Sequence, residues 1–128
     1  MIRINKIRKD NSAFTLVEIM IVVAIIGLLA ALAIPGFVKA RKQSQGRRIL
    51  NDARQMDAAI DQWALETGQT DGNAIDTTAA QTYLKTAWHS NDLLGHAYGV
   101  TVVGGTQMAV NATTKSALDG VGIDWGAY

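Results

Sequence analysis

The sequence predicts an α+β protein in which one long, kinked N-terminal helix packs against a small antiparallel β-sheet head. Three features of the 128-residue chain support this prediction. An apolar run covers residues 14–34, and an apolar stripe with helical spacing follows over residues 49–63. Two segments of alternating polarity then flank Gly104-Gly105. The first two features predict the helix, and the third predicts a hairpin.

The first part of the predicted helix is uniformly apolar. Of the 21 residues from Phe14 to Ile34, 13 are Leu, Ile, Val or Phe, and Glu18 carries the one charge. A helix of that length covers about 30 Å, the thickness of a bilayer's hydrocarbon core. These side chains contribute roughly −4 to −8 kcal/mol to insertion, against about +3 kcal/mol for an ionised group at mid-membrane. We therefore expect residues 14–35 to span a membrane. Glu18 is either a functional intramembrane carboxylate or a side chain that snorkels to the interface.

The second part of the predicted helix, residues 36–68, is amphipathic. Pro35 removes one backbone donor, so it should kink the helix rather than end it. Gly68 is a suitable residue to end the helix. Apolar residues recur between them at spacings of 4, 3, 4 and 3, which predicts one face packed against the head. That face consists of Ile49, Ala53, Met56, Ile60 and Trp63.

The head is expected over residues 69–128. A short helix should run from Thr78 to Thr86, capped by Asp76 or Thr77. Its apolar side should bury Ala80, Tyr83, Leu84 and Ala87. Two strands should follow, and then one helical turn. Their expected ranges are 98–103 and 106–112 for the strands and 114–118 for the turn.

A two-stranded hairpin is marginal on its own. We expect it to be held by the apolar stripe or by a third strand near 121–125. The chain has no cysteine, so the head must be held by helix packing, oligomerisation or a bound ion rather than by disulfides.

Charge is unevenly distributed along the chain. Residues 1–13 form a basic leader of net charge +3, Glu18 carries −1, residues 39–54 carry +5, and the part beyond Arg54 carries −6, for a total of +1. The total is too close to zero to favour a nucleic-acid partner. Basic residues lie on both sides of the apolar run, so charge counting does not decide its orientation. The 39–54 cluster could bind lipid headgroups or DNA, but a solvated or subunit-pairing helix face is the simpler interpretation.

The segment Ala13-Phe14-Thr15-Leu16-Val17-Glu18 resembles the class III signal of the type IV pilin superfamily. In that family a small residue, usually Gly, precedes the cleaved bond, Phe follows it, and Glu lies four residues further on. Gly27 and Pro35 also match positions at which the family places a glycine and a proline. The chain departs from the pattern in having Ala13 instead of Gly. It also lacks the C-terminal disulfide loop of many pilins.

The resemblance implies a structural subunit of a type IV-like filament. It implies cleavage between Ala13 and Phe14 and N-methylation of Phe14 by an inner-membrane prepilin peptidase, followed by extraction through an assembly platform and its ATPase. Glu18 would be neutralised by the new Phe14 amine of a neighbouring copy, with Gly27 and Pro35 contributing to assembly of the homopolymer. The precursor would lie in the bacterial inner membrane, and the mature filament would be periplasmic or extracellular. A type IV pilus subunit and a pseudopilin of type II secretion both fit, and the absence of cysteine together with the segment 91–98 favours the pseudopilin slightly.

Nothing in the sequence resembles an active site, so we do not expect an enzyme. His89 and His96 do not match a zinc-binding pattern, and no cofactor is expected. Asp119 and Asp124 are weak calcium candidates in a Gly-rich stretch, where solvated turn acids are the simpler interpretation. The segment 91–98 is loosely similar to a calcium-associated segment of major pseudopilins, but it lacks that segment's two prolines and tryptophan.

Two other functional interpretations compete with the filament subunit. Ala31-Leu32-Ala33 fits a secretory cleavage site, which would release a soluble exported binding domain that begins at Ile34. Alternatively, an uncut anchor would leave a membrane-bound enzyme or sensor. The mass of the mature N-terminus distinguishes them.

Overall fold

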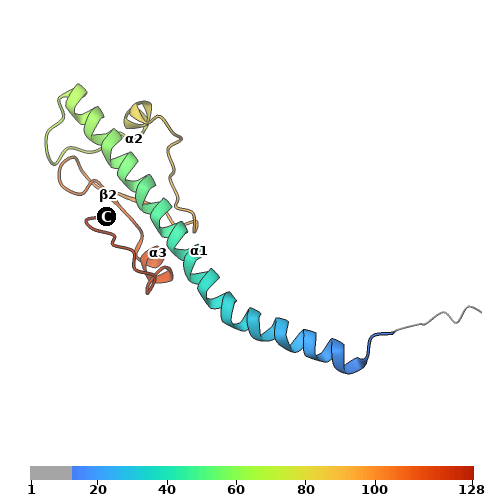
Figure 1. Cartoon of the computed structure of the whole chain (residues 1–128). Coiled ribbons are helices and arrows are strands. Elements are labelled where there is room, and N and C mark those ends of the chain that lie inside the picture. Colours follow the sequence, from blue (N-terminus) through green and yellow to red (C-terminus); the bar gives the residue numbers. More distant parts are fainter. Residues whose placement is uncertain (1–12) are drawn as a thin grey trace, which may run out of the picture. The chain divides into compact units, whose positions relative to one another are not determined.

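The computed structural model describes residues 13–128 and confirms the α+β class (Figure 1). The expected basic leader, residues 1–13, lies outside these residues except for Ala13. The chain divides after Gly36 into two compact units. The elements in order are α1 (Leu16–Thr67), α2 (Thr77–Ala80), the 3₁₀ helix η1 (Gln81–Tyr83), β1 (Gly99–Val100), β2 (Met108–Ala109) and α3 (Ala112–Ala117).

Helix α1 contains both the apolar run and the amphipathic stretch. Pro35 lies inside it, because a proline removes one helical hydrogen bond without breaking the rest. The predicted kink at Pro35 stays a prediction. The helix ends at Thr67, and Gly68 follows in the left-handed region with φ +68°. The backbone N–H of Gln69 then donates to the carbonyl of Ala64 at 2.8 Å, which is the bond of a Schellman cap.

The core of the second unit lies on one face of α1. The five stripe residues are at most 5% exposed, and they form one cluster with side chains of the hairpin and the C-terminal segment. Tyr98 adds a polar link, since its hydroxyl donates to the carbonyl of Ile49 at 3.3 Å. The side chains that meet this face include Val103, Met108, Val110, Leu118 and Val121.

The predicted hairpin is present, but its strands are shorter than expected. β1 and β2 are antiparallel, with Gly99 opposite Ala109 and Val100 opposite Met108. The turn between them uses Gly104 and Gly105 at φ +91° and +67°, a region that glycine enters without strain. The expected ranges of 98–103 and 106–112 were too long.

The chain leaves the hairpin after Thr101, whose N–H still donates to the carbonyl of Gln107 at 3.0 Å, and then pairs elsewhere. Val103 donates its N–H to the carbonyl of Asn73 at 2.9 Å and accepts from the N–H of Gly72 at 2.8 Å. This pairing buries Val103 and leaves Val102 44% exposed. The alternation predicted for residues 98–103 was therefore wrong beyond Tyr98, whereas Met108 and Val110, which alternate in the second segment, are both buried. The third pairing segment is therefore near Ala74, and the expectation of a strand at 121–125 was wrong.

The two short helices each begin at a capping side chain. Asp76 accepts hydrogen bonds from the N–H groups of Thr78 and Ala79 at 3.0 and 3.1 Å, and Asn111 caps α3. The helix expected to reach Thr86 is shorter, because Leu84 already adopts an extended backbone. Ala87 is exposed rather than buried.

The C-terminal segment, residues 118–128, runs beside the second half of α1 (Figure 1). Gln43 donates through Nε2 to the carbonyl of Val121 at 2.7 Å. Gly46 packs so closely that a Cβ there would lie 1.8 Å from Cδ1 of Ile123. The C-terminal segment therefore packs against the apolar face of α1 without forming a strand.

Candidate functional site

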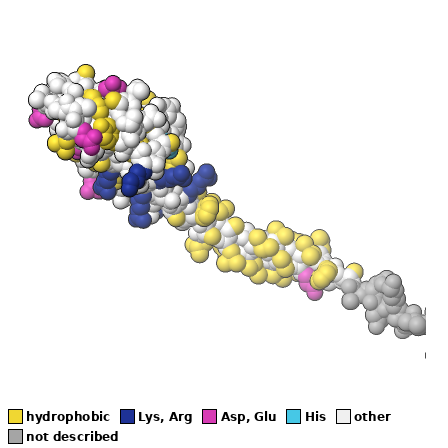
Figure 2. Space-filling model, turned by 90° about the horizontal axis from the view of Figure 1, so that it is seen from above, with side chains coloured by type: hydrophobic (Ala, Val, Ile, Leu, Met, Phe, Trp, Pro, Cys, Tyr) yellow, Lys and Arg dark blue, Asp and Glu magenta, His cyan; other side chains and the backbone are white. Residues whose placement is uncertain are grey.

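The first unit exposes an apolar helix surface interrupted by one acidic side chain (Figure 2). Its most apolar window has a mean hydropathy of 2.9, with none of it buried. The large apolar side chains from Phe14 to Ile34 are 49–84% exposed. By length and composition, the start of α1 can cross a membrane. Surface of this extent is stable in water only when lipid or protein covers it.

Thr15 and Glu18 form a reciprocal capping box at the start of α1. The N–H of Thr15 donates to Oε2 of Glu18 at 2.8 Å, and the N–H of Glu18 donates to Oγ1 of Thr15 at 3.2 Å. Sequence analysis missed this role, although the signal, Thr-x-x-Glu before an apolar run, is present in the sequence. The box sets the helix start at Leu16 and gives the carboxylate one donor.

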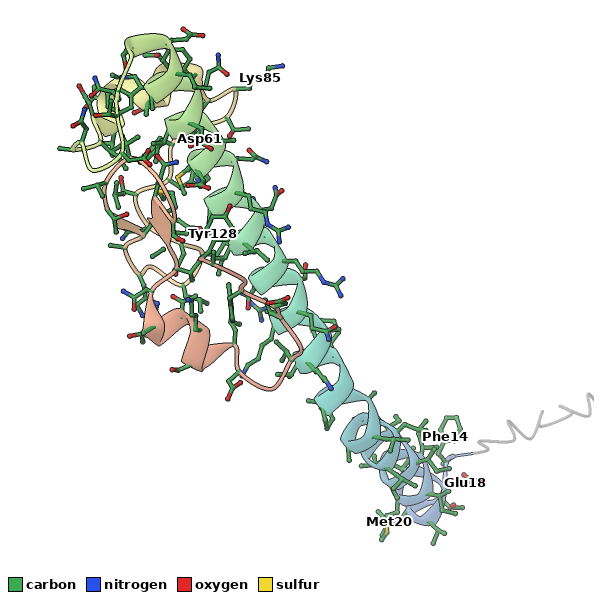
Figure 3. The ribbon with its side chains drawn as sticks, turned by 90° about the vertical axis from the view of Figure 1, so that its left-hand side faces the viewer. Phe14, Glu18, Met20, Asp61, Lys85 and Tyr128 are labelled. Atoms are coloured by element: carbon green, nitrogen blue, oxygen red, sulfur yellow. The ribbon has the colours of Figure 1, made fainter. Side chains whose placement is uncertain are left out.

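Phe14 lies beside this capping box, outside the helix (Figure 3). Its side chain is 84% exposed, and residues 13–15 have no regular secondary structure. The chain at Ala13-Phe14 is therefore exposed and outside the helix. Cleavage there would create an ammonium group four residues from Glu18.

Gly27 and Pro35 lie further along α1, and Pro35 is exposed. A Cβ on Gly27 would meet nothing within 4 Å, so the fold of the single chain does not require a glycine there.

The head holds a buried carboxylate that sequence analysis did not single out. Asp92 is 8% exposed and accepts from the N–H groups of Leu94 and His96 at 2.8 and 3.0 Å. The hydroxyl of Thr114 also donates to it. Because that hydroxyl has a single proton, His96 must donate from Nδ1 to Thr114 Oγ1 across 2.8 Å. The network joins the turn at 91–97 to α3.

The remaining candidate ligands lie apart. His89 Nδ1 lies 3.8 Å from Oδ2 of Asp52. Asp119 and Asp124 each accept from a nearby backbone N–H, that of Gly120 at 2.8 Å and that of Gly126 at 2.9 Å. Among residues 13–128, no three His, Cys, Asp or Glu side chains lie close enough to hold one ion. Calcium at Asp119 and Asp124 stays a prediction.

Comparison with known proteins identifies the N-terminal segment. Residues 8–34 match the prokaryotic N-terminal methylation motif. The type IV major fimbrial protein FimA of Dichelobacter nodosus is 47% identical over 85 residues, which cover 66% of this chain and 46% of that protein. Fimbrial protein Q of Moraxella bovis is 34% identical over 112 residues, covering 86% of this chain and 69% of that protein.

Similarity extends to secretion proteins. The type II secretion system core protein G of Pseudomonas aeruginosa is 39% identical over 59 residues, covering 46% of this chain and 42% of that protein. The chain spans less than half the length of several fimbrial relatives, 46% and 47% for two FimA proteins of Dichelobacter nodosus. No solved structure matches it.

Proposed function

The chain belongs to the type IV pilin family of fimbrial pilins and secretion pseudopilins, and we propose that it is a structural subunit of a type IV-like filament. The observation that carries the proposal is the exposed apolar start of α1, with Glu18 as its one charge. The named relatives are fimbrial and secretion proteins, which supports a structural rather than a catalytic role.

The apolar surface of residues 14–35 would be covered in two successive ways. Lipid covers it in the precursor, which is anchored in the bacterial inner membrane. Other copies of the same helix cover it in the homopolymer, whose heads face water outside that membrane. Head-to-tail contacts whose rotation does not close generate such a helical filament.

Glu18 would select how the copies align. A carboxylate buried without a counter-charge costs several kcal/mol, and the capping box supplies Thr15 N–H but no positive charge. The Phe14 amine of a neighbouring copy, formed by cleavage after Ala13, would supply that charge. The stagger that brings Phe14 and Glu18 together would therefore be favoured, with Gly27 and Pro35 contributing to assembly further along the helix.

Processing would precede assembly. The match to the methylation motif supports cleavage and N-methylation of Phe14 by a prepilin peptidase. The filament would then be built by an inner-membrane platform with an ATPase. A pilus subunit is the first candidate, because the relative that covers 86% of this chain is a fimbrial protein. A pseudopilin is the second, because core protein G aligns over part of the chain.

Substitution of Glu18 tests the proposal, with Gln as the discriminating variant. Gln preserves the capping box but carries no charge, whereas Ala removes both. We expect wild-type chain, co-expressed with a peptidase and assembly platform, to form filaments visible by electron microscopy. Both variants should insert into the membrane and form none. Normal filaments from Glu18→Gln would show that the cap, and not the charge, is what assembly needs.

A further inference from the structure

We propose that Lys39, Arg41 and Lys42 bind the headgroups of anionic phospholipids and hold the head of the unassembled subunit at the membrane surface. The inference rests on the membrane anchoring proposed above and adds a lipid preference to it. Three observations carry it: the position of these residues along α1, their exposure, and the lack of carboxylates near them.

The three residues follow closely on the apolar run. Lys39, Arg41 and Lys42 come five, seven and eight residues after Ile34, the last apolar residue before Pro35. Five to eight residues of helix rise about 8–12 Å, and the headgroup layer on each side of a bilayer is about 5–8 Å thick. Long basic side chains also reach back along the helix. Their charges can therefore lie at phosphate level.

The same side chains have no charged partner within the described part of the chain. Lys39 and Arg41 are exposed and Lys42 is half-buried. Across residues 13–128, the two ion pairs within 4.0 Å both involve histidines, His89 with Asp52 and His96 with Asp92. The Lys and Arg side chains visible in Figure 2 gather in one belt, and Lys85 lies apart at the other end of the head (Figure 3). Such a belt beside a membrane span attracts anionic lipid.

A second basic group on α1 provides a matched control. Arg47, Arg48 and Arg54 are exposed, but they lie 13 to 20 residues beyond Ile34, which is about 20–30 Å of helix. They carry the same total charge as the first group at a distance that the headgroup layer does not reach. A role of net charge alone would make the two groups equivalent.

Lipid contact can be measured on the full chain in phosphatidylcholine vesicles by electron paramagnetic resonance. A trace of spin-labelled phosphatidylglycerol or phosphatidylcholine reports which lipid the protein immobilises. We expect about a fivefold preference for phosphatidylglycerol, the effect of one basic residue at a charged surface, and its loss at high salt. Lys39→Gln/Arg41→Gln/Lys42→Gln should remove the preference, and Arg47→Gln/Arg48→Gln/Arg54→Gln should keep it.

Several outcomes would overturn the inference. The inference would be wrong if the wild-type chain showed no preference for phosphatidylglycerol, or if both triple variants lost that preference equally. Either result would leave the proposed membrane anchoring intact. A wild-type chain that fails to enter the vesicles would instead contradict the anchoring. A second copy's acidic head is the rival occupant. Ser44→Cys gives the chain its one cysteine, so that disulfide cross-linking between copies can be measured. If the Lys39, Arg41 and Lys42 variant loses this cross-linking but keeps the lipid preference, the acidic head is the occupant. Circular dichroism confirms that each variant folds.

Discussion

The phenol of Tyr128 donates a 3.1 Å hydrogen bond to Oδ2 of Asp57, which joins the C-terminal segment to α1. Oδ1 of the same carboxylate is buried without a hydrogen-bond partner among the described residues, as is Oε1 of Gln107. Burial raises the pKa of Asp57 above its ordinary value, the Tyr128 hydroxyl opposes the shift, and the neighbouring Asp61 charge adds to it. The surroundings of Asp57 therefore stabilise its protonated form more than water does.

This shift predicts that the head loses stability as pH rises. A group whose folded-state pKa is raised stabilises the fold below its unfolded pKa, and the contribution disappears as pH rises through the folded pKa. For Asp57 this decline begins at about pH 4. Denaturant unfolding followed by tryptophan fluorescence, on the full chain in detergent, should show the decline. Asp57→Asn, which cannot titrate, should flatten it. An unchanged pH profile in that variant would contradict the assignment.

The hydrogen bond itself is tested by Tyr128→Phe. The variant keeps the ring and loses the donor, so we expect the free energy of unfolding to fall by about 1 kcal/mol. In the Asp57→Asn background the loss should persist, because an Asn carbonyl still accepts from the hydroxyl. No change in either background would mean that the segment is held by packing alone.

We predict that position 46 must be glycine because the C-terminal segment packs closely against α1 there. A Cβ there would lie 1.8 Å from Cδ1 and 3.1 Å from Cγ1 of Ile123. Overpacking of this kind costs about 1–3 kcal/mol, against a gain of about 0.5–1 kcal/mol from replacing a helical glycine by alanine. We expect Gly46→Ala to destabilise the head in thermal unfolding. In an Ile123→Val background, which lacks Cδ1, the same change should cost less or stabilise.

Gly36 is the matched control for this experiment. It also lies inside α1, but a Cβ there would meet nothing within 4 Å. Gly36→Ala should therefore show only the gain in helix propensity. Equal losses from Gly36→Ala and Gly46→Ala would contradict the packing explanation.

Much of the fold was predictable because its signals are local and repeated. The apolar pattern repeats over many helical turns, first in the run of residues 14–34 and then in the stripe from Ile49 to Trp63. The ends of α1 could therefore be predicted to within two residues. The glycine pair at 104–105 likewise predicted the hairpin turn. Strand ends were wrong because Val103 pairs with Asn73, a partner 30 residues away that no local pattern indicates.

The candidate site shows the same division. Phe14 and Glu18 could be identified from one short segment, and so could the Thr15 capping box, had its spacing been considered. The Asp92 network could not, because Thr114 is 22 residues away from the carboxylate it contacts. Sequence patterns do not indicate contacts of this kind. A single polar side chain gives no periodic signal, and its partner is brought close only by tertiary packing.

Thr114 is expected to stabilise the buried Asp92 carboxylate. Its hydroxyl donates to Oδ2, and removing a donor from a buried charge costs about 1.5–3 kcal/mol. Thr114→Val has nearly the same shape and should lower the free energy of unfolding by that amount, whereas Thr114→Ser should keep most of the stability. A valine variant as stable as the serine variant would show that the hydroxyl contributes nothing.

Processing at Ala13-Phe14 is expected to depend on the size of the residue before the cut. The backbone at residues 13–15 is not helical and Phe14 is 84% exposed, so we expect the size of residue 13 to matter more for cleavage than the folding of the chain around it. We expect Ala13→Gly to be cleaved at least as fast as the wild type and Ala13→Leu to accumulate as precursor. Mass spectrometry of the mature chain should find methylated Phe14 at its start. A start at Ile34 in all three would instead show cleavage after Ala33, and the exposed apolar helix would then be a discarded secretory signal rather than the part that joins subunits.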